Sequence, residues 1–221
     1  MNFIIGDIHE EIVKLEDNSI DFIYTNPPFA TTNKKWDKSL KWNILFPEMW
    51  RVLKDNGVIA IHTAIPFTYE LIRIEKPKYH YVWTKNNPTC PMISKIQPLR
   101  NVEEILIYYK KQPTYNIQMK GNKEHYNNRK NKYNGYYGNQ KPNISKHKGN
   151  YPTTYLGSFS RIIQSNSPKS INDEITEYMI KTYTNEGDNI LDMTCCSKNN
   201  GEISVRLGRK YLGIDISDEF L

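Results

Sequence analysis

The stretch Ile20-Asp21-Phe22-Ile23-Tyr24-Thr25-Asn26-Pro27-Pro28-Phe29 is the most informative part of the sequence. Its apolar first half predicts a buried strand, and the proline pair predicts a stiff turn at the strand's end. The side-chain carbonyl of Asn26 and the main-chain carbonyl of Pro27 can both accept hydrogen bonds from one planar NH2 group. Phe29 offers a face on which a nucleobase can stack. The turn is therefore a candidate site for chemistry on an exocyclic amine, and the alternative is a structural turn closed by an aromatic residue.

Strands and helices alternate outward from this stretch. Predicted strands are Phe3–Ile5, Ile20–Tyr24, Val58–Ile61, Tyr79–Trp83, Glu104–Tyr109, Asn189–Asp192 and Tyr211–Ile216. Predicted helices are Glu10–Leu15, a segment from Ile44 that Asp55-Asn56-Gly57 closes, Pro66–Glu75, Ile171–Tyr183 and Gly201–Leu207. Such alternation predicts an α/β fold with a doubly wound, mostly parallel sheet. Ligands bind at the carboxyl ends of strands in these sheets, where Asn26 and Asp192 are both expected.

Composition limits the class of protein. A chain of 221 residues is long enough for one α/β domain, here residues 1–221, with an insertion over residues 112–165 where periodicity is lost. Cys90, Cys195 and Cys196 are too few and too poorly spaced for a disulfide framework or a zinc site. The sequence contains no apolar run of membrane-spanning length and no signal-like start, so we expect a reduced, cytoplasmic protein without a metal.

The positive charge is concentrated in one segment. Residues 110–150 hold ten Lys or Arg and one acid, Glu124, a local balance of +9 against +6 for the whole chain. Five tyrosines and many asparagines lie between these cations. Cations that alternate with aromatics suit a polyanion whose bases can stack, so we predict a nucleic-acid contact here. The alternative is a solvated basic loop.

The order of these motifs resembles the β group of amino-methylating DNA methyltransferases, in which the catalytic motif precedes the cofactor motif. The similarity is strongest to the phage-type adenine-N6 members, and it covers most of the chain outside residues 112–165. It is carried by Gly6-Asp7, Leu15–Asp21, Thr25–Phe29, Trp36-Asp37, Trp50–Lys54, Gly57, Pro66-Phe67, Tyr81–Lys85, Pro98–Arg100, Glu103–Ile105, Tyr183–Asp188, Asp192, Leu207–Lys210 and Gly213–Asp215. Protein-glutamine and ribosomal methyltransferases share a similar proline loop but carry their cofactor loop upstream of it, which favours DNA as the substrate.

The resemblance implies a Rossmann-like methyltransferase fold and assigns roles to individual residues. Asn26, Pro27, Pro28 and Phe29 would form the catalytic loop, with an adenine flipped out of the duplex onto Phe29. The cofactor S-adenosylmethionine would lie against the segment that contains Asp192, Thr194, Cys196 and Lys198. Asp215 would bind its ribose hydroxyls and Asp7 its adenine amine, and the alternatives are a helix N-cap for Asp215 and a polar turn for Asp7.

The cofactor segment departs from the family pattern. Cys196 and Lys198 stand where the family has glycines, which allow positive φ and a close approach of backbone to cofactor. Weakened cofactor binding is therefore expected, unless Lys198 pairs with the cofactor carboxylate. Two functions stay open: an adenine-N6 DNA methyltransferase of restriction-modification type, and an inactive homologue that binds DNA or a partner subunit. Cytosine N4 and RNA are weaker alternatives, and either a homodimer or a heterodimer with an active methyltransferase is compatible with the sequence.

Overall fold

The computed structural model describes residues 1–89, 91–118, 125–128, 144–147, 162–165 and 173–217. The chain divides into two compact units, one of Met1–Asn116 with Arg161–Leu221 and one of Ile117–Ser160. In the second unit, β6 (His125–Asn128) pairs antiparallel with β7 (Ile144–His147). Most of the predicted insertion 112–165, including the basic cluster Arg129, Lys130 and Lys132, lies outside the described residues.

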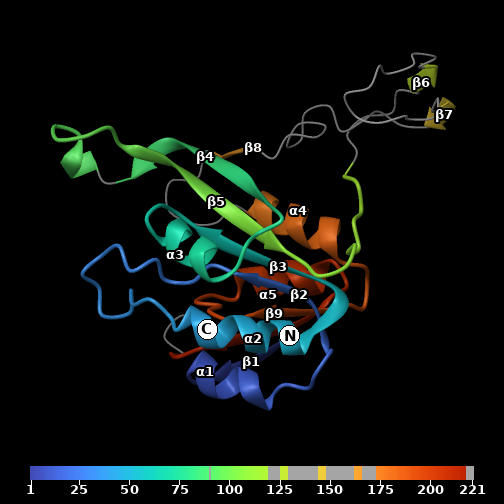
Figure 1. The fold of residues 1–221 in the computed structure, drawn as a ribbon, viewed down its shortest axis with the longest axis horizontal. Coiled ribbons are helices and arrows are strands. Elements are labelled where there is room, and N and C mark those ends of the chain that lie inside the picture. Colours follow the sequence, from blue (N-terminus) through green and yellow to red (C-terminus); the bar gives the residue numbers. More distant parts are fainter. Residues whose placement is uncertain (90, 119–124, 129–143, 148–161, 166–172, 218–221) are drawn as a thin grey trace. The chain divides into compact units, whose positions relative to one another are not determined.

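The first unit is built on an eight-stranded sheet in the order β1-β10-β9-β2-β3-β5-β4-β8 (Figure 1). Its strands are β1 (Asn2–Ile5), β2 (Ile20–Thr25), β3 (Leu53–Thr63), β4 (Tyr79–Thr89), β5 (Arg100–Tyr108), β8 (Ile162–Ser165), β9 (Asn189–Asp192) and β10 (Lys210–Asp215). Among these described strands, only β5 runs antiparallel to its neighbours, β3 and β4. The predicted α/β class with a mostly parallel sheet is confirmed.

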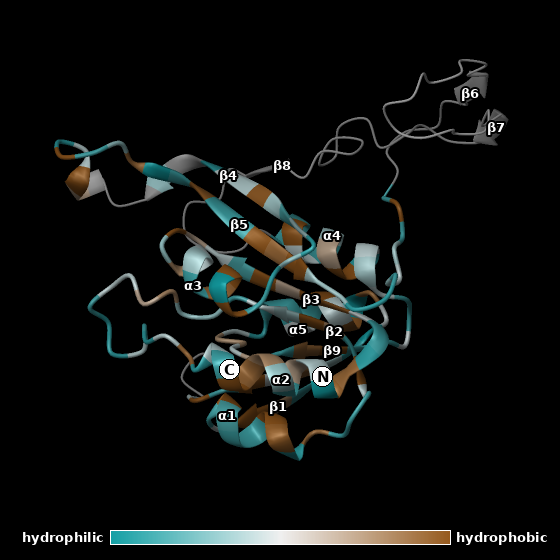
Figure 2. Ribbon diagram, in the orientation of Figure 1, coloured by the Kyte–Doolittle hydropathy of each residue, from teal (hydrophilic) through white to brown (hydrophobic). Residues whose placement is uncertain are grey.

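Helices cover both faces of the sheet. They are α1 (Ile8–Glu11) with the 3-10 turn Ile12–Lys14, α2 (Trp42–Val52), α3 (Phe67–Ile74), α4 (Asp173–Tyr183) and α5 (Asn199–Arg206). Successive side chains of a strand point to opposite faces, and β2 shows this alternation. Ile23 belongs to the core cluster that includes α1, α2 and α3, whereas Phe22 lies 5.7 Å from the ring of Tyr183 on α4. Figure 2 shows the hydrophobic residues concentrated along the central strands.

Residues 55–57 do not end a helix, contrary to the sequence prediction. Helix α2 ends at Val52, Leu53 is its C-cap in an extended conformation, and Asp55-Asn56-Gly57 lie within β3. The pairing of β2 with β3 shifts register between Ile20 and Phe22, which accommodates the extra residues. A Cβ on Gly57 would lie 2.7 Å from the Leu53 side chain and 2.9 Å from the main-chain oxygen of Asp21. The glycine is needed because two strands approach closely there, and a helix stop has the same sequence signature.

The predicted helix Glu10–Leu15 is also corrected. Helix α1 starts at Ile8 because Asp7 caps it, and the chain tightens into the 3-10 turn before Leu15 becomes extended. The other predicted elements match the observed ones with shifted ends, except that β4 and β5 extend into a longer arm than the sequence predicts. No helix in the described residues is long and apolar enough to cross a lipid bilayer.

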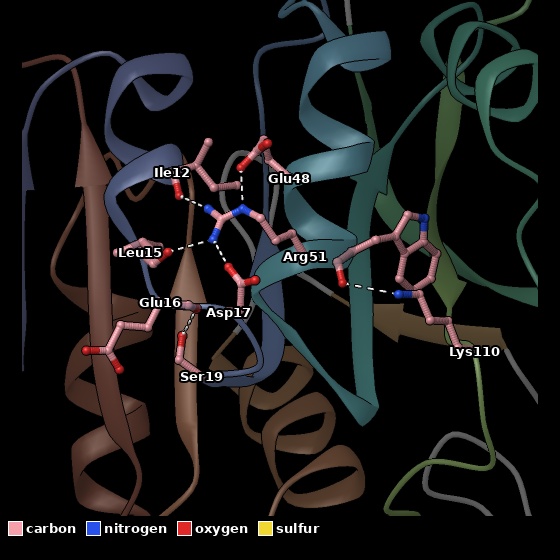
Figure 3. Close-up of polar contacts among 9 residues, drawn as sticks. Ile12, Leu15, Glu16, Asp17, Ser19, Glu48, Arg51 and Lys110 are labelled. Atoms are coloured by element: carbon pink, nitrogen blue, oxygen red, sulfur yellow. Dashed lines mark hydrogen bonds and ion pairs between the residues drawn. The ribbon is translucent and has the colours of Figure 1, made fainter.

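Arg51 joins the amino-terminal segment to α2 (Figure 3). Its guanidinium donates to the main-chain oxygens of Ile12 at 2.9 Å and Leu15 at 2.8 Å, and it also pairs with Asp17 and Glu48. The planar fork of donors suits several acceptors that lie in different directions. Arg51 thereby fixes the turn that leads into β2.

Asp21 links neighbouring strands at their amino ends. Its carboxylate pairs with Lys54 at 2.8 Å and accepts the main-chain N–H of Asn189 at 2.9 Å. These three residues come from the starts of β2, β3 and β9. One side chain therefore aligns the amino ends of three parallel strands.

Candidate active site

The proline loop begins at the carboxyl end of β2. Thr25, the last residue of the strand, is fully buried, while Asn26 is exposed. Pro27 is buried and Pro28 is half-buried, so the loop is anchored directly after Asn26. No described residue hydrogen-bonds to the Asn26 side chain. Its amide oxygen is therefore available to a ligand.

Phe29 is held in a fixed orientation by a second aromatic ring. It stacks on Phe67 with ring centroids 5.5 Å apart and an interplanar angle of 22°. Phe67 is the first residue of α3 and is buried in the core, whereas Phe29 is half-buried. Stacking on a buried ring restricts the rotamers of Phe29 and prepares it to contact a planar group.

Asp37 closes the loop that follows the motif. Its carboxylate accepts the main-chain N–H groups of Ala30 at 2.7 Å, Thr31 at 3.0 Å and Thr32 at 2.6 Å. Burial alone would raise the pKa of Asp37, but hydrogen bonds from Thr32 and from the three amides outweigh it and lower the pKa. Ala30 adopts a positive φ of 53°, a conformation that this brace holds in place.

A hydrogen bond between two threonines joins the candidate catalytic loop after β2 to the candidate cofactor segment after β9. Strands β2 and β9 are parallel neighbours, with Ile23 opposite Leu191. The hydroxyl of Thr25 lies 2.8 Å from that of Thr194 in the segment after β9. Residues 169 positions apart in sequence are therefore joined by a hydrogen bond next to Asn26.

Asp192 is a buried carboxylate at the end of β9. It accepts hydrogen bonds from the Asn200 side-chain amide at 3.0 Å, the Tyr211 hydroxyl at 3.1 Å and the main-chain N–H of Thr194 at 3.3 Å. Burial raises its pKa to about 6, because these hydrogen bonds only partly offset the loss of water. The group therefore titrates close to neutral pH.

A buried polar chain extends from Asp192 across the sheet. The Thr176 hydroxyl donates to the Asn200 side-chain oxygen at 3.0 Å and so accepts from Tyr24, 3.4 Å away. Tyr24 in turn accepts from Nε2 of His62 at 2.8 Å, which assigns the ring proton to that nitrogen. Burial lowers the pKa of His62 to about 3, so the ring is neutral. All the donors in this chain point toward Asp192.

Asp215 organises the turn after β9. Its carboxylate accepts the main-chain N–H of Cys196 at 2.8 Å and that of Ser217 at 3.1 Å. Strand β10 is packed closely against the turn, since a Cβ on Gly213 would lie 2.9 Å from the Cys195 sulfur. Asp215 caps none of the described helices, and its ribose-binding role stays a prediction.

The two residues at expected glycine positions differ from one another. Cys196 is exposed and has a positive φ of 47°, as the sequence argument anticipated. Lys198 is exposed, with φ −70° and ψ −12°, and it is the N-cap residue of α5. The expectation of positive φ is therefore wrong at Lys198, because the chain has already entered helical geometry there. Any contact of Lys198 with a cofactor stays a prediction.

Asp7 lies at the far side of the candidate site from Asn26, since β10 and β9 separate β1 from β2. It caps α1 through the main-chain N–H of His9 at 2.9 Å and also pairs with Nδ1 of that ring at 2.7 Å. These two hydrogen bonds lower the pKa of Asp7. Both use the same carboxylate oxygen, and no described residue hydrogen-bonds to the other. Nε2 of His9 accepts the N–H of Lys41, which links Asp7 to the start of α2.

Four residues of this site have no role assigned from the sequence: Thr25, Asp37, Asn200 and His9. Thr25 and Asp37 belong to motifs recognised in the sequence, yet their hydrogen-bond partners are set by the neighbouring strand and by the folded loop. A signal was available only for Asp37, an acid a short turn beyond a proline-rich loop with free amides. Asn200 and His9 carry no local sequence signal.

Comparisons with known proteins relate the chain to one family and one fold. The N6/N4 methyltransferase family model, described as "DNA methylase", matches residues 20–221. The type II methyltransferase M2.DpnII of Streptococcus pneumoniae is 25% identical over 247 residues, which cover 98% of this chain and 85% of the relative.

Two solved structures share the fold. The complex of M1.HpyAVI with S-adenosylmethionine has a TM-score of 0.60 at 21% identity and covers 99% of this chain and 93% of that chain. The PvuII DNA methyltransferase, described as cytosine-N4-specific, has a TM-score of 0.66 at 16% identity and covers 99% and 82%. At these identities the likeness establishes the fold alone.

Proposed function

The chain belongs to the family of N6/N4 DNA methylases, and we propose that it transfers a methyl group from S-adenosylmethionine to the N6 amine of adenine in DNA. The observation that carries this proposal is the exposed Asn26, anchored by buried Pro27 and joined to the turn after β9 by the Thr25–Thr194 hydrogen bond. An acceptor for an amine thus lies beside the segment expected to hold the cofactor.

The residues present fit this cofactor. Asp192 and Asp215 end two neighbouring strands, β9 and β10, and Asp7 follows β1, the next strand along the sheet. A carboxylate-rich edge suits a ligand that carries a sulfonium, an ammonium, two ribose hydroxyls and an adenine amine. The oxygen of Asp7 without a described partner would take the adenine amine, and Asp215 the ribose hydroxyls.

Asn26 and Pro27 would act on the reacting amine. S-adenosylmethionine, when bound, supplies an electrophilic methyl group, and the accepting amine loses one proton on methylation. The Asn26 side-chain oxygen and the Pro27 main-chain oxygen would each accept one N–H of the amine and so aim its lone pair. These hydrogen bonds strengthen as the nitrogen gains positive charge, which lowers the barrier. Phe29, fixed by Phe67, would stack on the flipped base.

Adenine and cytosine offer the same exocyclic amine to Asn26, so the amine alone does not distinguish the two bases. Adenine is favoured because the Thr25–Phe29 loop resembles that of adenine-N6 enzymes. The basic segment 110–150 supplies the attraction to DNA. Its contribution is tested by reversing the charges of Arg129, Lys130 and Lys132. The log–log salt slope of duplex binding should fall by about 0.9 for each phosphate that the variant no longer neutralises.

The conformation of Cys196 favours a second candidate function. A cysteine at positive φ, where the family has glycine, supports weak cofactor binding and hence a homologue that binds DNA without methylating it. Calorimetric titration of the purified protein with S-adenosylmethionine separates the two functions, since only the enzyme requires cofactor binding.

The decisive test is expression in a bacterial host that lacks DNA methyltransferases. Mass spectrometry of nucleosides from the host DNA should show N6-methyladenine, and sequencing of modified positions should give the target site. N4-methylcytosine in its place would overturn the adenine assignment. Unmodified DNA, together with no calorimetric signal, would favour the inactive homologue.

A further inference from the structure

The loop over residues 30–41, between the proline motif and α2, exposes an indole. Trp36 is 67% exposed, whereas Trp42 and Trp83 are buried and Trp50 is half-buried. A large apolar side chain left in water forgoes the free energy of burial, so one that is exposed on a folded loop is informative. In Figure 1 this loop extends away from the sheet beyond the carboxyl end of β2.

The main chain of the loop that contains Trp36 is held by hydrogen bonds at both of its ends. Asp37, the next residue, is only 6% exposed and holds the amides of Ala30, Thr31 and Thr32. Ala30 directly follows Phe29, so Trp36 is coupled to the proline motif through one side chain. The far end of the loop is tied by the Lys41 N–H to His9. The main chain on either side of Trp36 is therefore tied down close in sequence to the candidate base-binding face.

The charge around Trp36 suits a phosphate backbone. Lys34, Lys35 and Lys38 are exposed, and no ion pair among the described residues involves them. The single acid of the loop, Asp37, is turned inward to the three amides. An exposed aromatic ring flanked by three cations matches a duplex, which presents phosphates outside and stackable bases inside.

We propose that Trp36 is a positioning residue that enters the base stack of DNA and occupies the space left when the target base is flipped out. This proposal rests on the proposed function. Flipping costs base pairing and stacking, and an inserted aromatic ring replaces part of the lost stacking. Lys34, Lys35 and Lys38 hold the flanking phosphates. Trp36 thereby lowers the cost of presenting the amine to Asn26.

The test compares two duplexes that contain the target site found by sequencing. In one the target adenine is paired with thymine, and in the other it faces an abasic position, where flipping already costs little. Trp36→Ala should weaken binding to the paired duplex about 10- to 100-fold and binding to the abasic-opposed duplex by less than about threefold. Trp36→Phe should keep most of the affinity. The fluorescence of 2-aminopurine at the target position should rise with wild type and Trp36→Phe, but not with Trp36→Ala.

The double variant Lys34→Ala, Lys35→Ala is the matched control. It should weaken both duplexes equally and reduce the salt dependence, because it removes phosphate contacts alone. Thermal unfolding of Trp36→Ala should match wild type, since the indole is exposed.

Two outcomes would overturn the insertion. Equal reductions in affinity on the two duplexes with Trp36→Ala would make Trp36 a simple surface contact, and unchanged binding would mean that Trp36 does not touch DNA. Wild-type protein that methylates no DNA would instead overturn the proposed function and, with it, the role of Trp36. If wild type methylates DNA but Trp36→Ala shows equal reductions in affinity on both duplexes or unchanged binding, only the role of Trp36 is overturned.

Discussion

The two ends of the parallel strands differ in how completely their polar groups are used. At the amino ends, Arg51 makes four hydrogen bonds, and Asp21 pairs with Lys54 and an amide of β9. At the carboxyl ends, Asn26 is exposed with no described hydrogen-bond partner, and one oxygen of Asp7 is equally unused. Groups that are already paired stabilise the fold, whereas unpaired acceptors on a rigid edge are free to bind a ligand.

The carboxyl-end loops can expose unpaired side chains and still have a fixed main chain. The carboxyl-end loops are braced from behind, by Asp37 under the proline loop and by Asp215 under the turn after β9. The bracing carboxylates accept main-chain amides, so the loops are held through their backbone and their side chains remain free. Such pre-organisation is what catalysis by positioning requires.

Substitution at the carboxyl edge should abolish function without touching stability. Asn26→Ala should reduce the rate of methyl transfer at least about 100-fold, because it removes an acceptor that acts on the reacting amine. Duplex binding and the midpoint of thermal unfolding should stay within error of wild type, since Asn26 is exposed. Radiolabelled methyl transfer and electrophoretic mobility shift measure the two quantities.

Asn43→Ala, an exposed position on α2, is the control and should behave as wild type. Retention of most of the transfer rate by Asn26→Ala would remove Asn26 from the catalytic site.

Substitution at the amino ends of the strands should lower stability and leave the transfer rate per folded molecule unchanged. Arg51→Ala should lower the free energy of unfolding by about 3 kcal/mol, because it leaves two main-chain carbonyls and two carboxylates without their common donor. The transfer rate per folded molecule should be unchanged. Denaturant titration, with Arg73→Ala on α3 as an exposed matched control, checks this. A loss of activity larger than the loss of folded protein would show that the two ends are coupled.

The pH dependence of stability should report Asp192. Burial raises its pKa from 3.8 to about 6, so the stabilisation by the protonated form is complete below about pH 4 and is lost as the pH rises through about 6. Relative to Asp192→Asn, wild type should lose about 2 kcal/mol of unfolding free energy between about pH 4.5 and 7.5. Denaturant titrations across that range give the difference. Parallel curves would mean that Asp192 is not shifted.

The smallest effect should come from Cys196. Cys196→Gly should raise the free energy of unfolding by about 0.5–1 kcal/mol, because glycine adopts the observed positive φ without strain. It should also tighten S-adenosylmethionine binding, measured by calorimetry. Lys198→Gly should bring no such gain, because Lys198 has helical φ and ψ. Loss of cofactor affinity in Cys196→Gly would show that the thiol contributes to the site.

Local patterns in the sequence predicted much of the fold. The continuous apolar residues Val58–Ile61 predict a strand because they fit a sheet covered on both faces, and this strand is confirmed. The largely apolar stretch Ile20–Tyr24 after a turn predicts a second strand, which is also confirmed. The helix end predicted at Gly57 is wrong because a close approach of two strands and a helix stop both call for glycine. The proline pair predicts a stiff turn at the end of a strand, and Pro27 and Pro28 do follow β2 directly after Asn26.

The sequence by itself therefore determined the alternation of strands and helices, the proline loop at the end of a strand and the basic segment, since each depends on neighbouring residues. Only the tertiary structure decided that β2 lies beside β9, that Thr25 bonds to Thr194 and that Lys198 has helical φ and ψ. It also decided the raised pKa of Asp192, which follows from burial by segments distant in sequence. Strand order, burial and loop strain are set by packing between distant segments, so no local pattern can encode them.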